Sequence, residues 1–113
     1  MEDAFDRVAL ESRLGGDAEL IADVVRLFIE DCPARLDAIG TAIAGGDRSG
    51  LQSAAHALKG AAGYMEAPHV VASAAALESA ARDGRLTAAP ELFATLTRNT
   101  DTLVSQLRAT LER

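Results

Sequence analysis

Apolar residues recur at helical spacing along most of the chain, in five segments. The segments run from Phe5 to Leu14, from Ala18 to Ala44, from Leu51 to Met65, from His69 to Arg82, and from the residues after Thr87 toward the end. Apolar residues every three or four positions give a helix one continuous face for burial. No segment alternates with a period of two, so no strand is predicted. The sequence therefore predicts an all-α fold.

Residues that begin and end helices separate these segments. Asp6 and Asp17 are expected N-caps, and Gly-Gly pairs follow the first and second segments. Pro33 lies within the second segment, where a proline removes one intrahelical hydrogen bond. Of one long kinked helix or two helices meeting near Cys32, we favour the kinked helix. Four substantial helices with short loops predict an antiparallel up-down-up-down four-helix bundle, with the short N-terminal helix capping one end.

The third helix has two contrasting faces. With about 100° between successive residues, His56 lies opposite an apolar face, and Lys59, Gly60 and Gly63 lie within roughly 60° of its direction. The apolar face comprises Leu51, Ala54, Ala55, Leu58, Ala61, Ala62 and Met65. Each glycine lowers helix stability by about 1 kcal/mol relative to alanine, and neither is needed to turn the chain. We infer that the bare backbone beyond His56 lets another molecule approach closely.

The same residues carry a family resemblance. The stretch from His56 to Gly63, HALKGAAG, resembles the His-x-Leu-Lys-Gly motif of the histidine-containing phosphotransfer domains of multistep phosphorelays. The resemblance extends to the Gly-Asp pair before this helix and to LESAARDGRL after it. One departure is Met65-Glu66-Ala67, where the family commonly has a glycine in a Leu-Gly-Ala context. The resemblance implies that a receiver domain, with a phosphorylatable aspartate and bound Mg²⁺, docks at His56 and exchanges a phosphoryl group with its imidazole.

His56 is accordingly the predicted phosphorylated nucleophile, since neutral imidazole is a competent covalent nucleophile. Lys59 is predicted to attract the phosphoryl oxygens through its charge. The predicted partner docking face consists of Gly60, Gly63, Gln52 and Ser53.

The other histidine and the acidic residues are not predicted to take part in the chemistry. His69 has neither the spacing to pair with His56 at a metal nor another partner in the pattern, and we interpret it as structural or surface. The acidic residues at Glu30, Asp31 and elsewhere are interpreted as solvated helix faces. No metal site and no cofactor is predicted.

Composition limits the classes of function. With 113 residues, the chain is predicted to form a single domain, 1–113. A net charge of −6 argues against nucleic-acid partners. The chain has neither an apolar run long enough to cross a membrane nor a signal peptide, so we expect a cytoplasmic protein with no membrane partner. We also expect it to be a monomer. The single Cys32 cannot form an internal disulfide and is expected to be a small, buried or half-buried apolar residue.

Together these observations predict a phosphorelay intermediate. It would accept a phosphoryl group on His56 from a phospho-aspartate receiver domain and pass it to another response regulator, with receivers and a hybrid histidine kinase as partners. Autonomous kinase activity is not expected, because the sequence has no P-loop or other nucleotide-binding pattern. The alternative is a non-catalytic helical-bundle module that binds receiver or kinase domains without phosphotransfer. A histidine-kinase dimerisation domain fits less well, because such domains usually have an acidic residue after the histidine, where this chain has Ala57.

Overall fold

The computed structural model describes residues 3–112, which form helices and contain no strand, as predicted. The elements are α1 (Arg7–Arg13), α2 (Ala18–Ala44), α3 (Arg48–Tyr64), α4 (Pro68–Arg82), the short 3-10 helix η1 (Leu86–Ala88) and α5 (Ala89–Leu111). No helix in this part of the chain is long and apolar enough to cross a membrane.

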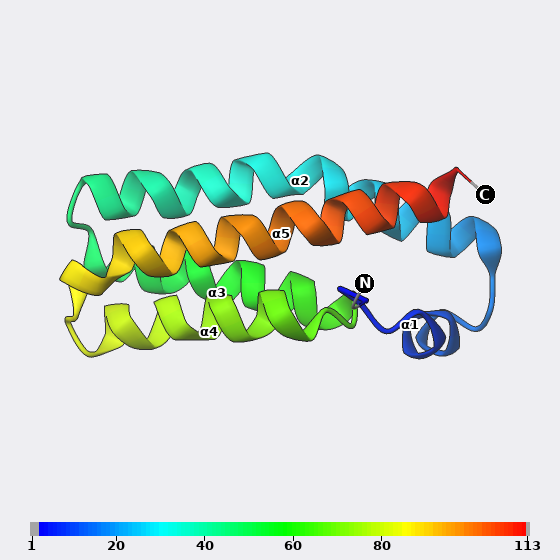
Figure 1. Ribbon diagram of the computed structural model, residues 1–113, viewed down its shortest axis with the longest axis horizontal. Helices are drawn as coiled ribbons and strands as arrows, with labels where there is room; N and C mark the ends of the chain where they lie inside the picture. Colours follow the sequence, from blue (N-terminus) through cyan, green and yellow to red (C-terminus); the bar gives the residue numbers. More distant parts are fainter. Residues whose placement is uncertain (1–2, 113) are drawn as a thin grey trace.

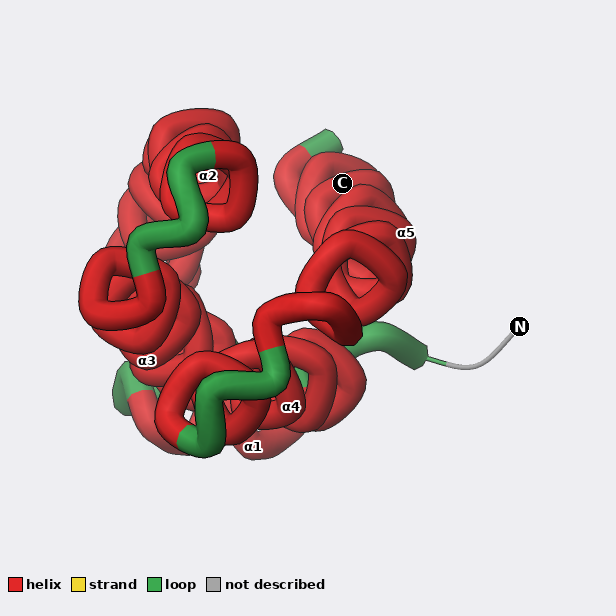
Figure 2. Tube along the Cα trace, turned by 90° about the vertical axis from the view of Figure 1, so that its left-hand side faces the viewer, coloured by secondary structure: helices red, strands yellow, loops and turns green. Residues whose placement is uncertain are grey.

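The four long helices form an antiparallel bundle. Their axes lie along the long dimension of the molecule and each runs opposite to the one before it (Figure 1). Seen from the end, α2, α3, α4 and α5 are arranged around a ring, so α3 and α5 are diagonally opposite (Figure 2). The short α1 lies at the end of the bundle where α3 turns into α4, which confirms its predicted capping position.

The helix boundaries follow from local signals. Asp6, Asp17 and Asp47 each accept backbone N–H bonds at the start of α1, α2 and α3, as N-caps do. Helix α2 continues through Pro33 as one helix with the predicted bounds. Helix α1 is shorter than predicted, because Phe5 precedes it as a buried residue outside the helix. The 3-10 turn before α5 was not predicted.

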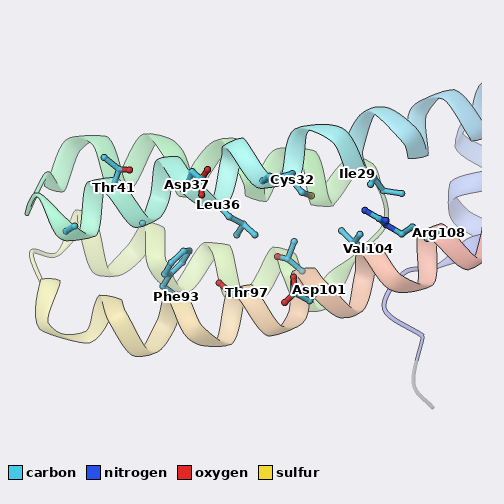
Figure 3. A pocket seen from close by; sticks show the side chains of 14 residues that line it. Ile29, Cys32, Leu36, Asp37, Thr41, Phe93, Thr97, Asp101, Val104 and Arg108 are labelled. Atoms are coloured by element: carbon cyan, nitrogen blue, oxygen red, sulfur yellow. The ribbon is translucent and has the colours of Figure 1, made fainter.

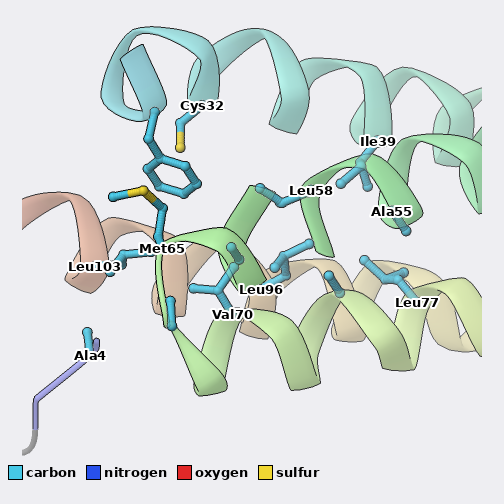
Figure 4. Packing of buried hydrophobic residues seen from close by; sticks show 14 of the residues in the cluster. Ala4, Cys32, Ile39, Ala55, Leu58, Met65, Val70, Leu77, Leu96 and Leu103 are labelled. Atoms are coloured by element: carbon cyan, nitrogen blue, oxygen red, sulfur yellow. The ribbon is translucent and has the colours of Figure 1, made fainter. Parts of the chain in front are cut away.

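The core lies between the four helices and contains the apolar face of α3 (Figure 4). Leu51, Ala55, Leu58 and Ala62 are fully buried, which confirms the direction predicted for this face. Cys32 is also buried, and burial raises the pKa of its thiol to about 11. The thiol therefore stays protonated at neutral pH, consistent with a packing residue.

A groove of the bundle opens between α2 and α5, on the side away from α3 and α4. It encloses about 870 Å³, with Leu36 and Phe93 on its two walls and Asp37 and Asp101 at its rim (Figure 3). No residue of α3 lines it. The groove is thus separate from the histidine predicted to carry the chemistry.

Glu66, the departure from the family pattern, occupies a special backbone position. Its φ of +58° lies in the left-handed region that favours glycine, just after the end of α3. The Glu66 carbonyl accepts the N–H of Asp6 at 2.8 Å, and its carboxylate accepts the Nε–H of Arg13 at 3.0 Å. A non-glycine residue in this conformation costs on the order of 1 kcal/mol, and the bond from Arg13 to the Glu66 carboxylate is the contact specific to glutamate that offsets part of that cost.

Candidate functional site

His56 lies in the middle of α3 and points away from the core. Its side chain is 68% exposed, whereas Leu58, two residues later, is fully buried. The contrast follows from helical geometry, because two residues differ by about 200° in direction. The imidazole is therefore accessible to another protein, as predicted.

A buried carboxylate from the neighbouring helix holds this imidazole. Glu78 of α4 is only 8% exposed, and its Oε2 lies 2.7 Å from Nδ1 of His56. The second oxygen, Oε1, lies 2.5 Å from Nζ of Lys59. Histidine and lysine, one turn apart on α3, thus share one carboxylate on α4.

The two partners keep Glu78 ionised. The hydrogen bond from Lys59 is the largest influence and lowers the pKa of the carboxyl, burial opposes it, and the bond from His56 lowers the pKa further. The net result is a pKa below the ordinary glutamate value. The site therefore contains a fixed negative charge at neutral pH.

The charge on Glu78 determines which imidazole nitrogen can react. An ionised carboxylate only accepts hydrogen bonds, so Nδ1 of His56 must carry the hydrogen. In the neutral ring the lone pair then resides on Nε2, the nitrogen not engaged by Glu78. The geometry presents Nε2 as the nucleophilic atom.

The low pKa of Glu78 also predicts how stability depends on pH. A carboxyl with a depressed folded-state pKa contributes stability that is fully present above its unfolded pKa, near 4.3, and is lost as the pH falls through the lower folded value. We expect Glu78→Gln to lower the free energy of unfolding by about 1 to 3 kcal/mol at pH 7. The difference from wild type should shrink below about pH 4. Urea unfolding of both proteins between pH 3 and 7 measures it, and a difference that is constant with pH would contradict the assigned ionisation.

The four predicted docking residues near His56 differ in how exposed they are. A Cβ placed on Gly60 would meet no atom within 4 Å, so this position is open, as its angle on the helix predicts. Ser53 is exposed, whereas Gln52 is half-buried. Gly63 is also half-buried and faces α4, because its hypothetical Cβ would lie 3.9 Å from Val71.

Glu78 was missed by the sequence prediction, and the interpretation of acidic residues outside the caps as solvated helix faces was wrong for it. Helical spacing could have placed Glu78 on the buried face of α4, because it lies four residues after Ala74 and three before Ala81. Both alanines are fully buried. A carboxylate on the buried face of a helix requires partners, and here they are the site residues. Lys59 is one turn from His56 as predicted, but its ammonium contacts Glu78 and its side chain is only 32% exposed.

His69 does not join this cluster. It lies in the first turn of α4, nine residues before Glu78, which places their backbones about 14 Å apart along the helix. The structure thus brings together His56, Lys59 and Glu78, and leaves His69 at the other end of α4.

Comparison with known proteins agrees with this arrangement. The Hpt domain model matches residues 23–113, which is most of the chain and includes every residue of the site. The chain belongs to the Hpt domain family. This Hpt domain is similar to the crystal structure of histidine-containing phosphotransfer protein B (HptB) from Pseudomonas aeruginosa PAO1, with a TM-score of 0.93 and 25% sequence identity. The match covers 100% of this chain and 98% of that chain.

A comparison with curated proteins gives no match. The family match and the structural match confirm the predicted resemblance and the helical-bundle fold, and they support a histidine phosphotransfer role in phosphorelays. As an Hpt domain, the protein is a phosphotransfer carrier and not a kinase.

Proposed function

We propose that this Hpt domain accepts a phosphoryl group on Nε2 of His56 from the phospho-aspartate of a receiver domain and passes it to a second receiver. The observation that carries the proposal is the 2.7 Å contact between Nδ1 of His56 and the Glu78 carboxylate. It directs the reactive nitrogen of an exposed imidazole outward, where a partner can reach it. A hybrid histidine kinase is the expected origin of the phosphate.

The proposed transfer step forms one bond to phosphorus and breaks one. The Nε2 lone pair of His56 forms the N–P bond while the bond between phosphorus and the aspartyl oxygen breaks, and the aspartate leaves as a carboxylate. The Nδ1 hydrogen remains in its bond to Glu78, whose negative charge stabilises the imidazole as it becomes electron-poor. The reverse step returns the phosphoryl group to another aspartate.

The receiver is proposed to supply the remaining groups. Phosphoryl transfer usually relies on a metal ion that neutralises charge on the phosphoryl oxygens, and in this proposal Mg²⁺ comes with the receiver's aspartate. This chain then contributes the nucleophile, its orientation by Glu78 and the positive charge of Lys59.

Phosphorylated receivers incubated with the purified protein test this function. We expect the protein to gain acid-labile, base-stable label from at least one receiver of the same cell, because phosphohistidine is lost in acid. The alternative function, a binding module without phosphotransfer, predicts complex formation with a receiver but no label. We expect the protein to act as a monomer, which size-exclusion chromatography with light scattering measures.

Lys59 offers a second test of the proposed chemistry. Its ammonium lies one turn from His56 and contacts the same carboxylate, so it can attract phosphoryl oxygens and also hold Glu78 in place. We expect Lys59→Met to slow single-turnover transfer by roughly tenfold, corresponding to about 1.4 kcal/mol of transition-state stabilisation.

Lys59→Arg keeps the charge and provides the matched control for that prediction. It should recover most of the rate at low ionic strength, where a partly exposed charge is least screened. Equal rates for wild type and Lys59→Met under those conditions would show that Lys59 has no part in the transfer.

A further inference from the structure

The groove between α2 and α5 has apolar walls that the bundle leaves partly exposed. Ile29 and Leu36 of α2 line one wall, Phe93 and Val104 of α5 line the other, and all four are only half-buried (Figure 3). Their inner sides pack on the core. The volume of about 870 Å³ lies within the range typical of binding clefts, roughly 300 to 1,000 Å³. The groove therefore has the size and the apolar character of a binding site.

The shape of the groove favours a helix as its occupant. The lining residues extend from Ile29 to Ala44 on α2, which is about 22 Å at 1.5 Å per residue. A groove of this volume and length is about 40 Å² in cross-section, enough for one row of side chains but not for a whole helix about 10 Å across. A helix that lies along α2 and α5 can insert such a row, as helices do when they pack against a pair of helices.

Two carboxylates without a partner select the charge of the occupant. Asp37 on α2 and Asp101 on α5 line opposite walls of the groove, and both are exposed. Among the residues that the structure describes, neither forms a hydrogen bond or an ion pair. Figure 3 shows Asp101 across the groove from Cys32, and Cys32 precedes Asp37 by five residues, so the two carboxylates are offset by about 8 Å along the groove. A partner should therefore have a positive charge on each of its two flanks.

We propose that this groove binds an amphipathic helix of a partner protein, one whose apolar ridge is flanked by basic residues on both sides. The ridge covers Leu36 and Phe93, and a lysine or arginine on each flank lies over Asp37 and Asp101. Apolar a and d positions between charged e and g positions give a coiled-coil helix the same arrangement. A second copy of the chain fits less well, because two molecules of net charge −6 repel each other.

A helix bound in the groove leaves His56 accessible. No residue of α3 or α4 lines the groove, and α5 lies diagonally across the bundle from α3 (Figure 2). The inference thus goes beyond the proposed function, because it gives the domain a second binding surface that a receiver at His56 does not cover. Binding at this surface involves no phosphotransfer and can be tested without it.

Synthetic peptides are suitable probes for the groove. We expect a labelled helical peptide of about 15 residues, the length of the groove, with leucine at its a and d positions and lysine at e and g, to bind the full-length protein. Two matched peptides, one with glutamate in place of lysine and one with serine in place of leucine, should each bind at least about tenfold more weakly. Fluorescence anisotropy at low ionic strength measures all three. Equal affinity for the lysine and glutamate peptides would overturn the proposal.

The location of the bound peptide is measured by amide chemical shifts of the ¹⁵N-labelled protein. Shifts should change at Thr41, Thr97 and Val104, which line the groove, and should not change at Lys59 or Gly60 beside His56. Changes confined to α3, or to the surface between α2 and α3, would place the peptide elsewhere and overturn the proposal.

Removal of the two carboxylates separates a specific site from general attraction to an acidic protein. Asp37→Asn combined with Asp101→Asn should weaken binding of the lysine peptide by about five- to tenfold. The matched control, Glu11→Gln combined with Asp83→Asn, removes the same charge at two exposed positions outside the groove and should stay within about twofold of wild type. All four positions are exposed, so both double variants should fold.

An equal loss of affinity in the two double variants would overturn the proposal, because the attraction would then be non-specific. A wild-type dimer that the lysine peptide converts to monomer, measured by light scattering, would also overturn it, because a second copy would then be the natural occupant of the groove.

Discussion

Replacing His56 by glutamine is expected to abolish phosphotransfer while leaving the bundle folded. The glutamine amide has no nucleophilic nitrogen, because its lone pair is delocalised into the carbonyl, so neither direction of transfer can proceed. The loss should be complete within the background of the assay. Since the His56 side chain is 68% exposed, its removal deletes no core contact and the unfolding temperature should change by only a few degrees.

The matched control for this variant is His69→Gln, which removes the other histidine of the chain. His69 lies about 14 Å along α4 from Glu78, so its loss should leave the transfer rate unchanged. Label measured after transfer from a phosphorylated receiver, followed by mapping of the phosphorylated peptide, distinguishes the two residues. Normal transfer in His56→Gln, or label on the peptide that contains His69, would contradict the assignment of the nucleophile.

The sequence predicted the direction of His56 correctly because direction on a helix depends only on local geometry. Once α3 is recognised as a helix, a period of 3.6 residues places His56 opposite Leu58 whatever surrounds them. The caps at Asp6 and Asp17 were predictable for the same reason, since each bonds to backbone N–H groups within three residues.

The partner of His56 was not predictable in this way. Glu78 is 22 residues later, and its place opposite His56 depends on the turn between α3 and α4 and on the register in which the two helices pack. Sequence periodicity does not give that register. It does indicate that a carboxylate between Ala74 and Ala81 faces inward, and this is the signal that could have found Glu78.

Helix α2 contains the reverse case, apolar residues that fit the buried pattern but are exposed in the structure. Leu20, Leu27 and Phe28 all fit one apolar helical pattern, yet only Phe28 is buried. A helix has room for a limited buried face, and the three-dimensional arrangement decides which apolar residues remain outside it. The exposure of Leu20 and Leu27 therefore became visible only with the structure.

Substitutions at Gly60 should change the stability of the fold and the docking of the partner in different directions. The position is open, so Gly60→Ala should raise the free energy of unfolding by up to about 1 kcal/mol through higher helix propensity. Gly60→Gln should also remain folded, because a Cβ at this position meets open space and a longer side chain can extend toward solvent. Stability therefore increases or holds in both variants.

These variants should slow transfer even though they do not destabilise the fold, because we propose that the docked receiver fills the open space above Gly60. Gln at position 60 lies one turn from His56 and would occupy the space that the receiver's aspartate must enter, so we expect transfer to fall by roughly a hundredfold or more, with a smaller loss for Gly60→Ala. Ala94→Gln adds the same side chain at an exposed position of α5, diagonally across the bundle, and should leave transfer unchanged. Single-turnover transfer and thermal unfolding measured on all four proteins test the two effects together. If Gly60→Gln transfers phosphate as fast as wild type, no partner approaches this face of α3 closely, and the docking geometry inferred around His56 is wrong.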